Sequence, residues 1–88
     1  MTLAGKTVIV TGGSGAIGSV VARRFVEAGS QVLVADMQSP RPEDMEMLGK
    51  RSSSLVFHET DVLSEPSLQR LFAMAESYGG PHVLVNVA

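Results

Sequence analysis

The chain has 88 residues, a length that suits a single small domain. Hydrophobic residues make up 44% and charged residues 18%, with a net charge of −2 and no Lys- or Arg-rich run, so the composition argues against a disordered chain and against a nucleic-acid-binding protein. No cysteine is present, which excludes disulfide bonds, thiolate catalysis and cysteine-based metal sites.

The first part of the chain predicts a strand, a glycine-rich turn and a helix. The run Lys6–Val10 is short, apolar and rich in β-branched residues, as in strands that are buried on both faces of a parallel sheet. A helix is predicted over Ala16–Ala28, with Gly29 as the residue that ends it. Four apolar residues at helical spacing are expected to share one face of this helix: Ile17, Val21, Phe25 and Ala28.

The rest of the chain continues to alternate between strands and helices. A second strand is predicted over Gln31–Asp36, a third over Ser54–Thr60 and a fourth over His82–Ala88. Between the second and third strands, a short helix is predicted over Glu43–Lys50, directly after Pro42.

The helix before the fourth strand has the clearest signals. Ser64 is predicted to cap a helix over Glu65–Tyr78, and Pro66 suits the first turn of that helix. An apolar stripe at helical spacing is expected to pack into the core: Leu68, Leu71, Phe72 and Ala75.

This order of elements predicts an α/β fold for a single domain over residues 1–88. Strands that alternate with helices favour a parallel sheet with helices on both faces, a three-layer α-β-α arrangement. Right-handed crossovers then give part of a Rossmann-type sheet with the strand order 3-2-1-4. In that order the fourth strand is an open apolar edge, which favours aggregation or pairing with another chain.

The glycines between the first strand and the first helix predict a phosphate-binding turn. Residues Gly13–Gly18 match G-x-G-x-x-G, in which one glycine makes the tight turn, one admits the pyrophosphate and one lets the helix pack on the strand. An anion is favoured there, because the first N–H groups of a helix lack internal partners and carry the positive end of the dipole. No Lys-Ser/Thr pair follows the glycines, so a nucleotide-triphosphate loop is excluded.

An acidic residue supports a dinucleotide as the ligand. Asp36 ends the second predicted strand, 18 positions after Gly18. A carboxylate at this place accepts hydrogen bonds from the ribose hydroxyls of the adenosine. A solvated loop carboxylate is the alternative, and the glycine turn favours the ribose role.

The sequence gives no sign of a metal site or a membrane segment. His58 and His82 stand apart without metal-ligand spacing, so a structural or incidental role is expected for each. The uncharged segment 7–22 is shorter than the roughly 20 residues that span a bilayer. Its centre is rich in Gly and Ser, which makes it a poor signal peptide. We therefore expect a cytoplasmic protein with no membrane partner and no metal.

Four motifs follow one another along the chain, each at the C-terminal end of a predicted strand, where open α/β sheets bind ligands. They are TGGSGAIG at residues 11–18, Asp36, the pair Asp61 and Val62, and LVNVA at residues 84–88. Together they resemble the short-chain dehydrogenase/reductase family over essentially the whole chain. The resemblance implies an NAD-dependent oxidoreductase that moves hydride between an alcohol or ketone carbon and the nicotinamide.

The resemblance also implies which residues bind the cofactor. It assigns the pyrophosphate and ribose turn to Gly12, Ser14, Gly15, Ile17 and Gly18. Asp36 is the implied acceptor for the ribose diol, and Met37 beside it is also assigned to the cofactor site.

The same resemblance implies NAD rather than NADP as the cofactor. No Arg or Lys stands at Gly15 or Met37, where members that prefer NADP often carry a positive charge. A 2′-phosphate beside Asp36 would also meet like-charge repulsion.

At the adenine end of the cofactor, the resemblance implies a hydrogen bond from the ring to Asp61, with Val62 packed beside it. Asn86 and Ala88 match the N-N-A-G end of the family's fourth strand, although Val87 stands where the family has a second asparagine.

The turn leaves the branch of the family open. Ala16 stands at the second glycine of T-G-x-x-x-G-x-G, the form written by the single-domain branch. The turn instead fits T-G-x-x-G-x-x-G, which is typical of the extended branch of nucleotide-sugar epimerases and dehydratases. The single-domain branch is favoured by LAGKTVIVTGG at residues 3–13, the helix Glu65–Tyr78 and PHVLVNVA at residues 81–88.

No catalytic residue is assigned in this chain, because the family's serine and Tyr-x-x-x-Lys pair would lie beyond Ala88. The single tyrosine, Tyr78, is followed four residues later by His82 and is expected to pack at the end of its helix. We expect the cofactor-binding part of an enzyme, with no turnover by the chain alone. A small-molecule substrate and a homo-oligomer are expected for the full-length protein. The alternatives are an epimerase or dehydratase of the extended branch, and a truncated non-catalytic product that at most binds nucleotide.

Overall fold

A computed structural model of the chain describes residues 3–38 and 54–87. In chain order its elements are β1 (Thr7–Thr11), α1 (Ala16–Glu27), β2 (Gln31–Asp36), β3 (Leu55–Glu59), α3 (Glu65–Ser77) and β4 (Val83–Asn86). These bounds lie within two residues of the predicted ones. The short helix predicted over Glu43–Lys50 and the site residue Ala88 lie outside the described residues.

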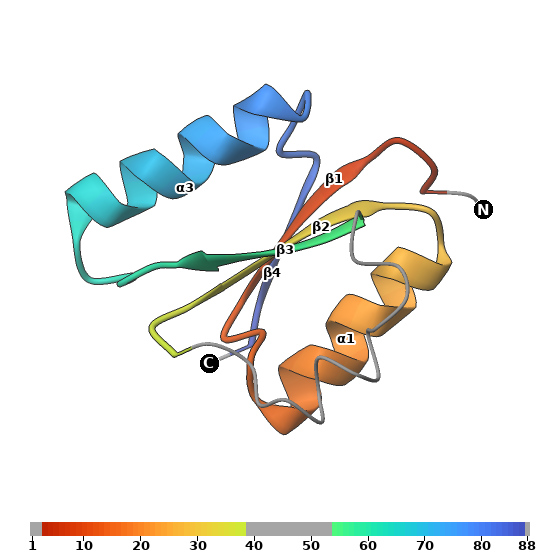
Figure 1. The fold of residues 1–88 in the computed structure, drawn as a ribbon, viewed down its shortest axis with the longest axis horizontal. Coiled ribbons are helices and arrows are strands. Elements are labelled where there is room, and N and C mark those ends of the chain that lie inside the picture. The colour runs from red at the N-terminus through yellow and green to blue at the C-terminus, as the bar shows by residue number, and fades with distance from the viewer. Residues whose placement is uncertain (1–2, 39–53, 88) are drawn as a thin grey trace.

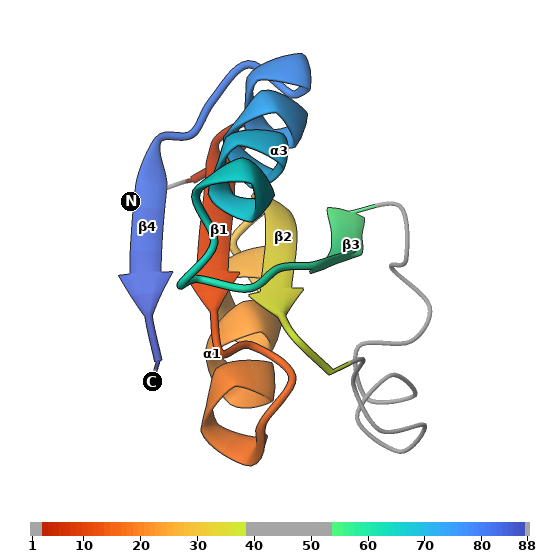
Figure 2. The ribbon, with the colours of Figure 1, turned by 90° about the vertical axis from the view of Figure 1, so that its left-hand side faces the viewer.

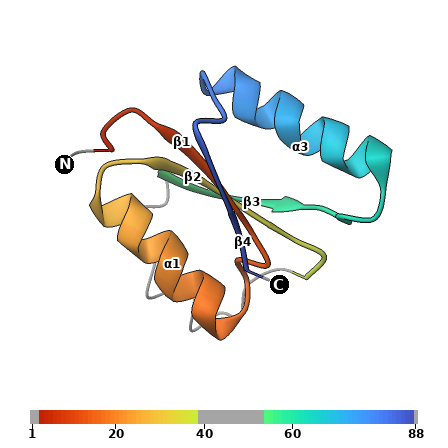
Figure 3. The same ribbon diagram turned by 180° about the vertical axis from the view of Figure 1, so that it is seen from behind.

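The strands form one parallel sheet in the order β3-β2-β1-β4, which confirms the predicted order. Figure 2 shows the strands side by side, and Figures 1 and 3 show α1 and α3 on opposite sides of the sheet. A connection between two parallel strands must cross one face of the sheet. Helix α1 crosses one face between β1 and β2, and α3 crosses the other face between β3 and β4. The described part of the chain is therefore the predicted three-layer, Rossmann-type arrangement.

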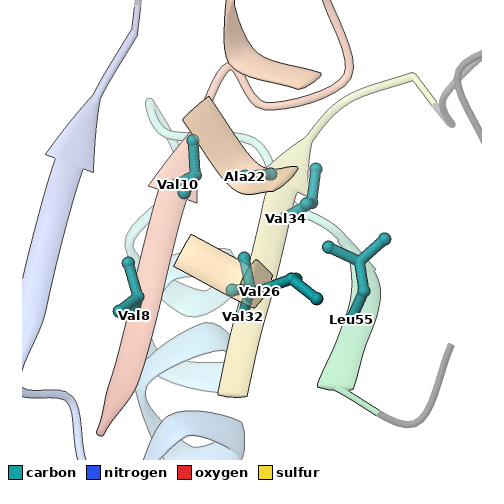
Figure 4. Close-up of a cluster of buried hydrophobic side chains, with 7 residues drawn as sticks. All are labelled: Val8, Val10, Ala22, Val26, Val32, Val34 and Leu55. Carbon is teal, nitrogen blue, oxygen red and sulfur yellow. The ribbon is translucent and has the colours of Figure 1, made fainter. Parts of the chain in front are cut away.

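The face of the sheet that meets α1 is packed with small and β-branched side chains. Its buried residues are Val8, Val10, Val32, Val34 and Leu55 from the strands, with Ala22 and Val26 from α1 (Figure 4). Successive residues of a strand point to opposite faces, so the residues between these valines serve the other face. This double burial explains why β1 and β2 read as continuous apolar runs.

The buried face of α1 differs from the predicted one. Val21 and Phe25 pack partly buried against the core, whereas Ile17, which was predicted on the same helix face and was also assigned to the cofactor turn, is 71% exposed. The buried positions of the helix are small or β-branched: Gly18, Ser19, Ala22 and Val26. Small side chains let α1 approach the sheet closely, and Ile17 lies exposed in the first turn of the helix.

The opposite face of the sheet packs against α3. Ile9, Leu33 and Ala35 from the strands are buried with Leu71 and Ala75 from the helix. Phe72 packs partly buried against this cluster, so Leu71, Phe72 and Ala75 of the predicted stripe are confirmed as core, whereas Leu68 is half-buried and belongs to neither cluster.

The N-terminus of α3 carries the predicted cap. The Ser64 hydroxyl accepts a hydrogen bond from the backbone N–H of Ser67 at 3.3 Å, and proline stands in the first turn of the helix. This bond satisfies one of the N–H groups that have no partner within the helix. The cap thereby fixes where the chain leaves the loop after β3 and enters α3.

Replacing Ser64 with alanine is expected to lower the free energy of unfolding by about 1 kcal/mol, because the Ser67 N–H loses its acceptor. Ser77→Ala, at the exposed end of the same helix, provides the control and is expected to change stability by less than about 0.5 kcal/mol. Urea unfolding followed by circular dichroism measures both variants. Equal effects of the two substitutions would argue against the cap.

β4 forms one edge of the described sheet. Among the described residues it pairs with β1 alone, and Leu84 is 56% exposed. The predicted open apolar edge is therefore present in the described part of the chain. Within the same residues, neither helix has both the length and the apolar character that crossing a membrane requires.

Candidate functional site

A cleft of about 360 Å³ lies at the C-terminal ends of the strands. Because the strands are parallel, these ends meet at one edge of the sheet, which is the edge toward which the arrowheads point in Figure 2. The lining of the cleft includes these predicted site residues: Gly12, Asp36, Met37, Val62 and Asn86. The sheet topology thus brings together motifs that are far apart in the sequence.

The glycine turn is packed so closely that side chains are excluded from two of its positions. Gly12 has a φ of +71°, a conformation that L-residues with a side chain rarely adopt, and its N–H donates to Ala35 O at 2.8 Å. A Cβ at Gly13 would lie 2.7 Å from Val34 Cγ1. A Cβ at Gly18 would overlap Gly12 O and lie 2.5 Å from Gly13 Cα. The glycines therefore let α1 dock directly on the turn.

The N-terminus of α1 is open to an anion. Gly15 is the N-cap residue and provides no side-chain cap, and the first turn of the helix has no acidic residue. Ala16, Ile17 and Gly15 are all exposed there. A negatively charged group is favoured at such an end, because the first N–H groups have no partner within the helix. The bare turn and the uncapped helix fit the pyrophosphate of a dinucleotide.

Asp36 lies beside this turn and is bonded to it. Its Oδ2 accepts hydrogen bonds from the Ser14 hydroxyl at 2.6 Å and from the Ser14 N–H at 3.3 Å. Its Oδ1 accepts from the Gln38 N–H at 3.3 Å. The acidic residue and the glycine turn, 22 positions apart from Ser14 to Asp36, form one polar unit.

Burial of the Asp36 carboxyl acts to raise its pKa, but hydrogen bonds outweigh this effect and hold the pKa below the ordinary value of 3.8. The donors are the Ser14 hydroxyl and the backbone N–H groups of Gln38, Ser14 and Met37. Asp36 is therefore ionised at neutral pH, and an ionised carboxylate only accepts hydrogen bonds.

Asp61 lies next to the cleft rather than in it. It lines a neighbouring cleft of about 500 Å³, which shares Met37 and Thr60 with the first. Its Oδ1 accepts from the Leu63 N–H at 2.9 Å, which shapes the loop before α3. Val62 does line the first cleft and is 52% exposed.

Asn86 ends β4 and faces the end of β1. Its Oδ1 accepts a hydrogen bond from the Thr11 hydroxyl at 2.7 Å, which joins the two strand ends. Val87, at the family's second asparagine position, lines the cleft with an apolar side chain and donates its N–H to Thr11 O at 2.9 Å.

Five residues that line the cleft were not assigned to the site from the sequence: Thr11, Ala35, Gln38, Thr60 and Val87. Thr11 and Thr60 stand directly at or after the ends of β1 and β3. The rule that ligands bind at strand C-termini could therefore have found both of them. Gln38 carries no comparable signal, since its place depends on the path of the chain after β2.

The two histidines and the tyrosine have structural contacts. His82 Nδ1 accepts from the Thr7 N–H at 2.9 Å, and Tyr78 O accepts from the Thr7 hydroxyl at 3.2 Å. His58 Nδ1 lies 3.0 Å from Thr60 Oγ1. In the described ranges 3–38 and 54–87, no group of three or more potential metal ligands comes together.

Comparison with curated proteins gives relatives along nearly the whole chain. An uncharacterized oxidoreductase of Thermotoga maritima is 40% identical over 98% of this chain and 34% of its own length. The L-fucose dehydrogenase of Rattus norvegicus is 39% identical over 96% of this chain and 30% of its own. The chain therefore spans about a third of the length of these relatives.

The structure and a family profile agree with these relatives. The hydroxysteroid dehydrogenase from Escherichia coli superimposes with a TM-score of 0.82 at 29% identity, over 97% of this chain and 36% of its own. The profile of the short chain dehydrogenase family matches residues 6–88. This match includes the glycine turn, Asp36 and the ends of all four strands. The chain belongs to the short chain dehydrogenase family.

Proposed function

We propose that residues 1–88 are the dinucleotide-binding part of an NAD-dependent oxidoreductase that moves hydride between an alcohol or ketone carbon and the nicotinamide. The observation that carries this proposal is the bare glycine turn bonded to Asp36 at the edge of one cleft. When bound, a nicotinamide dinucleotide supplies the ring carbon that exchanges the hydride. The reaction and its small-molecule substrate are proposed for the whole protein, because the chain spans about a third of its relatives.

In this proposal the glycine turn holds the pyrophosphate and the adjoining ribose. The residues assigned to it are Gly12, Ser14, Gly15, Ile17 and Gly18. Support comes from the uncapped N-terminus of α1 and from the lack of side chains between the turn and the helix. Backbone N–H groups and the helix dipole would orient the cofactor there and would not move protons.

Asp36 is proposed to bind the adenosine ribose and to select NAD over NADP. An ionised carboxylate accepts hydrogen bonds from both ribose hydroxyls but repels a 2′-phosphate. Met37, the next residue along the cleft, is uncharged and 63% exposed, so it offers a phosphate no compensating cation.

The adenine ring is assigned to the loop after β3. The exposed apolar side chain of Val62 gives a flat ring a surface to pack on. Asp61 Oδ2 accepts no hydrogen bond within the described residues, so it is available to the amino group of the ring. Asn86 and Ala88 complete the proposed set, Asn86 from the lining of the cleft.

The alternative function is that of an extended-branch epimerase or dehydratase. One observation favours it, the T-G-x-x-G-x-x-G spacing at residues 11–18, which is typical of that branch. The relatives named above are an oxidoreductase and two dehydrogenases, which favours hydride transfer to a separate substrate. A cytoplasmic location and a homo-oligomeric whole protein belong to the same proposal.

Titration of the chain with NADH and with NADPH, followed by nicotinamide fluorescence, tests the proposal. NADH is expected to bind more tightly. Asp36→Asn is expected to narrow the ratio of the two dissociation constants by about tenfold, since a hydrogen bond to a charged group is worth roughly 1.5–3 kcal/mol.

The matched control is Glu76→Gln. Glu76 lies near the end of α3, is exposed and lines neither the 360 Å³ cleft nor the 500 Å³ cleft. Its removal takes away the same charge and is expected to leave the ratio unchanged. Tighter binding of NADPH than of NADH by the unmodified chain would contradict the assignment of Asp36.

A further inference from the structure

Ser14 uses both of its hydrogen-bond donors on a single oxygen of Asp36. The hydroxyl reaches Oδ2 at 2.6 Å and the backbone N–H reaches the same atom at 3.3 Å. A distance of 2.6 Å is typical of a charge-assisted O–H···O⁻ bond, which is about twice as strong as a neutral one. Ser14 does not line the 360 Å³ cleft, whereas Asp36 does.

The position of Ser14 means that it can act on a ligand through Asp36. Asp36 is the last residue of β2, and the segment after it is exposed at Met37 and Gln38. A carboxylate at a strand end has rotational freedom about its own side-chain bonds. Ser14 holds it from the turn on one side, and the Gln38 N–H holds the other oxygen.

The hydrogen bond between Ser14 and Asp36 determines which ligands the pair can bind. A serine hydroxyl has one proton, and here that proton is committed to Asp36. The pKa of Asp36 is lowered by the same bond, so the carboxyl carries no proton at neutral pH. Neither group then has a proton to donate. The lining of the 360 Å³ cleft contains no lysine or arginine, and Arg70 lines the neighbouring 500 Å³ cleft instead. A ribose diol brings its own donors to such a site, whereas a 2′-phosphate brings only acceptors and negative charge.

We propose that Ser14 is a specificity-determining positioning residue, which selects NAD over NADP by holding the Asp36 carboxylate in place and withholding its own proton from a 2′-phosphate. This inference rests on the proposed function, since it deepens the role of Asp36 there. It differs from a pyrophosphate contact, because a contact with the pyrophosphate would affect NADH and NADPH alike.

The experiment compares the dissociation constants of NADH and NADPH for the unmodified chain and four variants. Ser14→Ala and Ser14→Gly both remove the hydroxyl, and glycine is compatible with any backbone conformation of the turn. Both are expected to reduce the preference for NADH over NADPH by about fivefold to tenfold. This corresponds to part of the free energy of one charge-assisted hydrogen bond. Ser14→Thr keeps a hydroxyl and is expected to retain most of the preference. Ser77→Ala, a serine at the far end of α3, is expected to retain all of it.

A double-variant cycle separates a positioning role from a direct contact. In an Asp36→Asn background, Ser14→Ala is expected to change the ratio by less than about twofold, because Ser14 then has no carboxylate to hold. An undiminished effect in that background would overturn the proposal and would indicate that Ser14 contacts the nucleotide itself.

The outcomes also distinguish this inference from the proposed function. If the unmodified chain prefers NADH and both Ser14→Ala and Ser14→Gly keep that preference, the inference fails while the proposed function stands. If the unmodified chain binds neither nucleotide, the proposed function fails, and the inference fails with it.

Discussion

Gly18→Ala is expected to destabilise the protein by about 3 kcal/mol, at the upper end of the usual range for overpacking, and to abolish nucleotide binding. The new Cβ would overlap Gly12 O and lie 2.5 Å from Gly13 Cα, and these are backbone atoms that no rotamer change can move aside. Thermal unfolding followed by circular dichroism is the measurement. A domain of this size is expected to lose roughly 12 °C or more in Tm for such a change.

The expected loss of stability is opposite to the usual effect of a glycine-to-alanine substitution in a helix. Gly18 lies within α1, where replacing glycine by alanine ordinarily stabilises a helix by about 0.5–1 kcal/mol. A rise in Tm for Gly18→Ala would therefore show that α1 does not rest on the turn as described. Gly15→Ala is the matched control, because its Cβ would lie 3.8 Å from Gly12 O, an ordinary contact. Its cost is expected to be about 1 kcal/mol or less, the loss of a glycine N-cap.

Leu33→Ala is expected to lower the free energy of unfolding by about 2–5 kcal/mol, because it leaves a cavity in the layer between the sheet and α3. Leu33 is fully buried on β2, an interior strand, in the same cluster as Ile9 and Leu71. Proteins of this kind have only about 5–15 kcal/mol of total stability, so the variant would be close to unfolding at 37 °C.

The control for Leu33→Ala is the same substitution at Leu84. Leu84 is 56% exposed on the edge strand β4, and its removal is expected to cost less than about 1 kcal/mol. Chemical denaturation of both variants gives the comparison. Similar midpoints for Leu33→Ala and Leu84→Ala would contradict the description of the core.

Much of the fold was predictable because local patterns agreed with one another. The β-branched runs at Val8–Val10 and Val32–Val34 could be read as buried strands, and Ser64 with Pro66 marked the start of α3. Parallel strands with short connections then leave few topologies, and the observed strand order is one of these. Asp36 could be placed at the site in advance, because its position at a strand end follows from the sequence.

Other features depended on contacts that no local pattern records. Apolar spacing along α1 indicated that Ile17 shares one face with Val21 and Phe25, since such spacing counts large side chains and not the space available to them. The helix instead rests on Gly18, Ala22 and Val26, and Ile17 is exposed at the end that faces the proposed cofactor.

The sequence by itself determined the element order, the bare glycine turn and an acidic residue at the end of β2, because each depends on a few neighbouring residues. Only the tertiary structure decided that Ser14 donates to Asp36 and that Thr11 donates to Asn86. These bonds join residues that are 22 and 75 positions apart. Their partners meet because parallel strands deliver their C-terminal ends to one edge of the sheet, where Thr11 pairs with Asn86 in the register of β1 and β4.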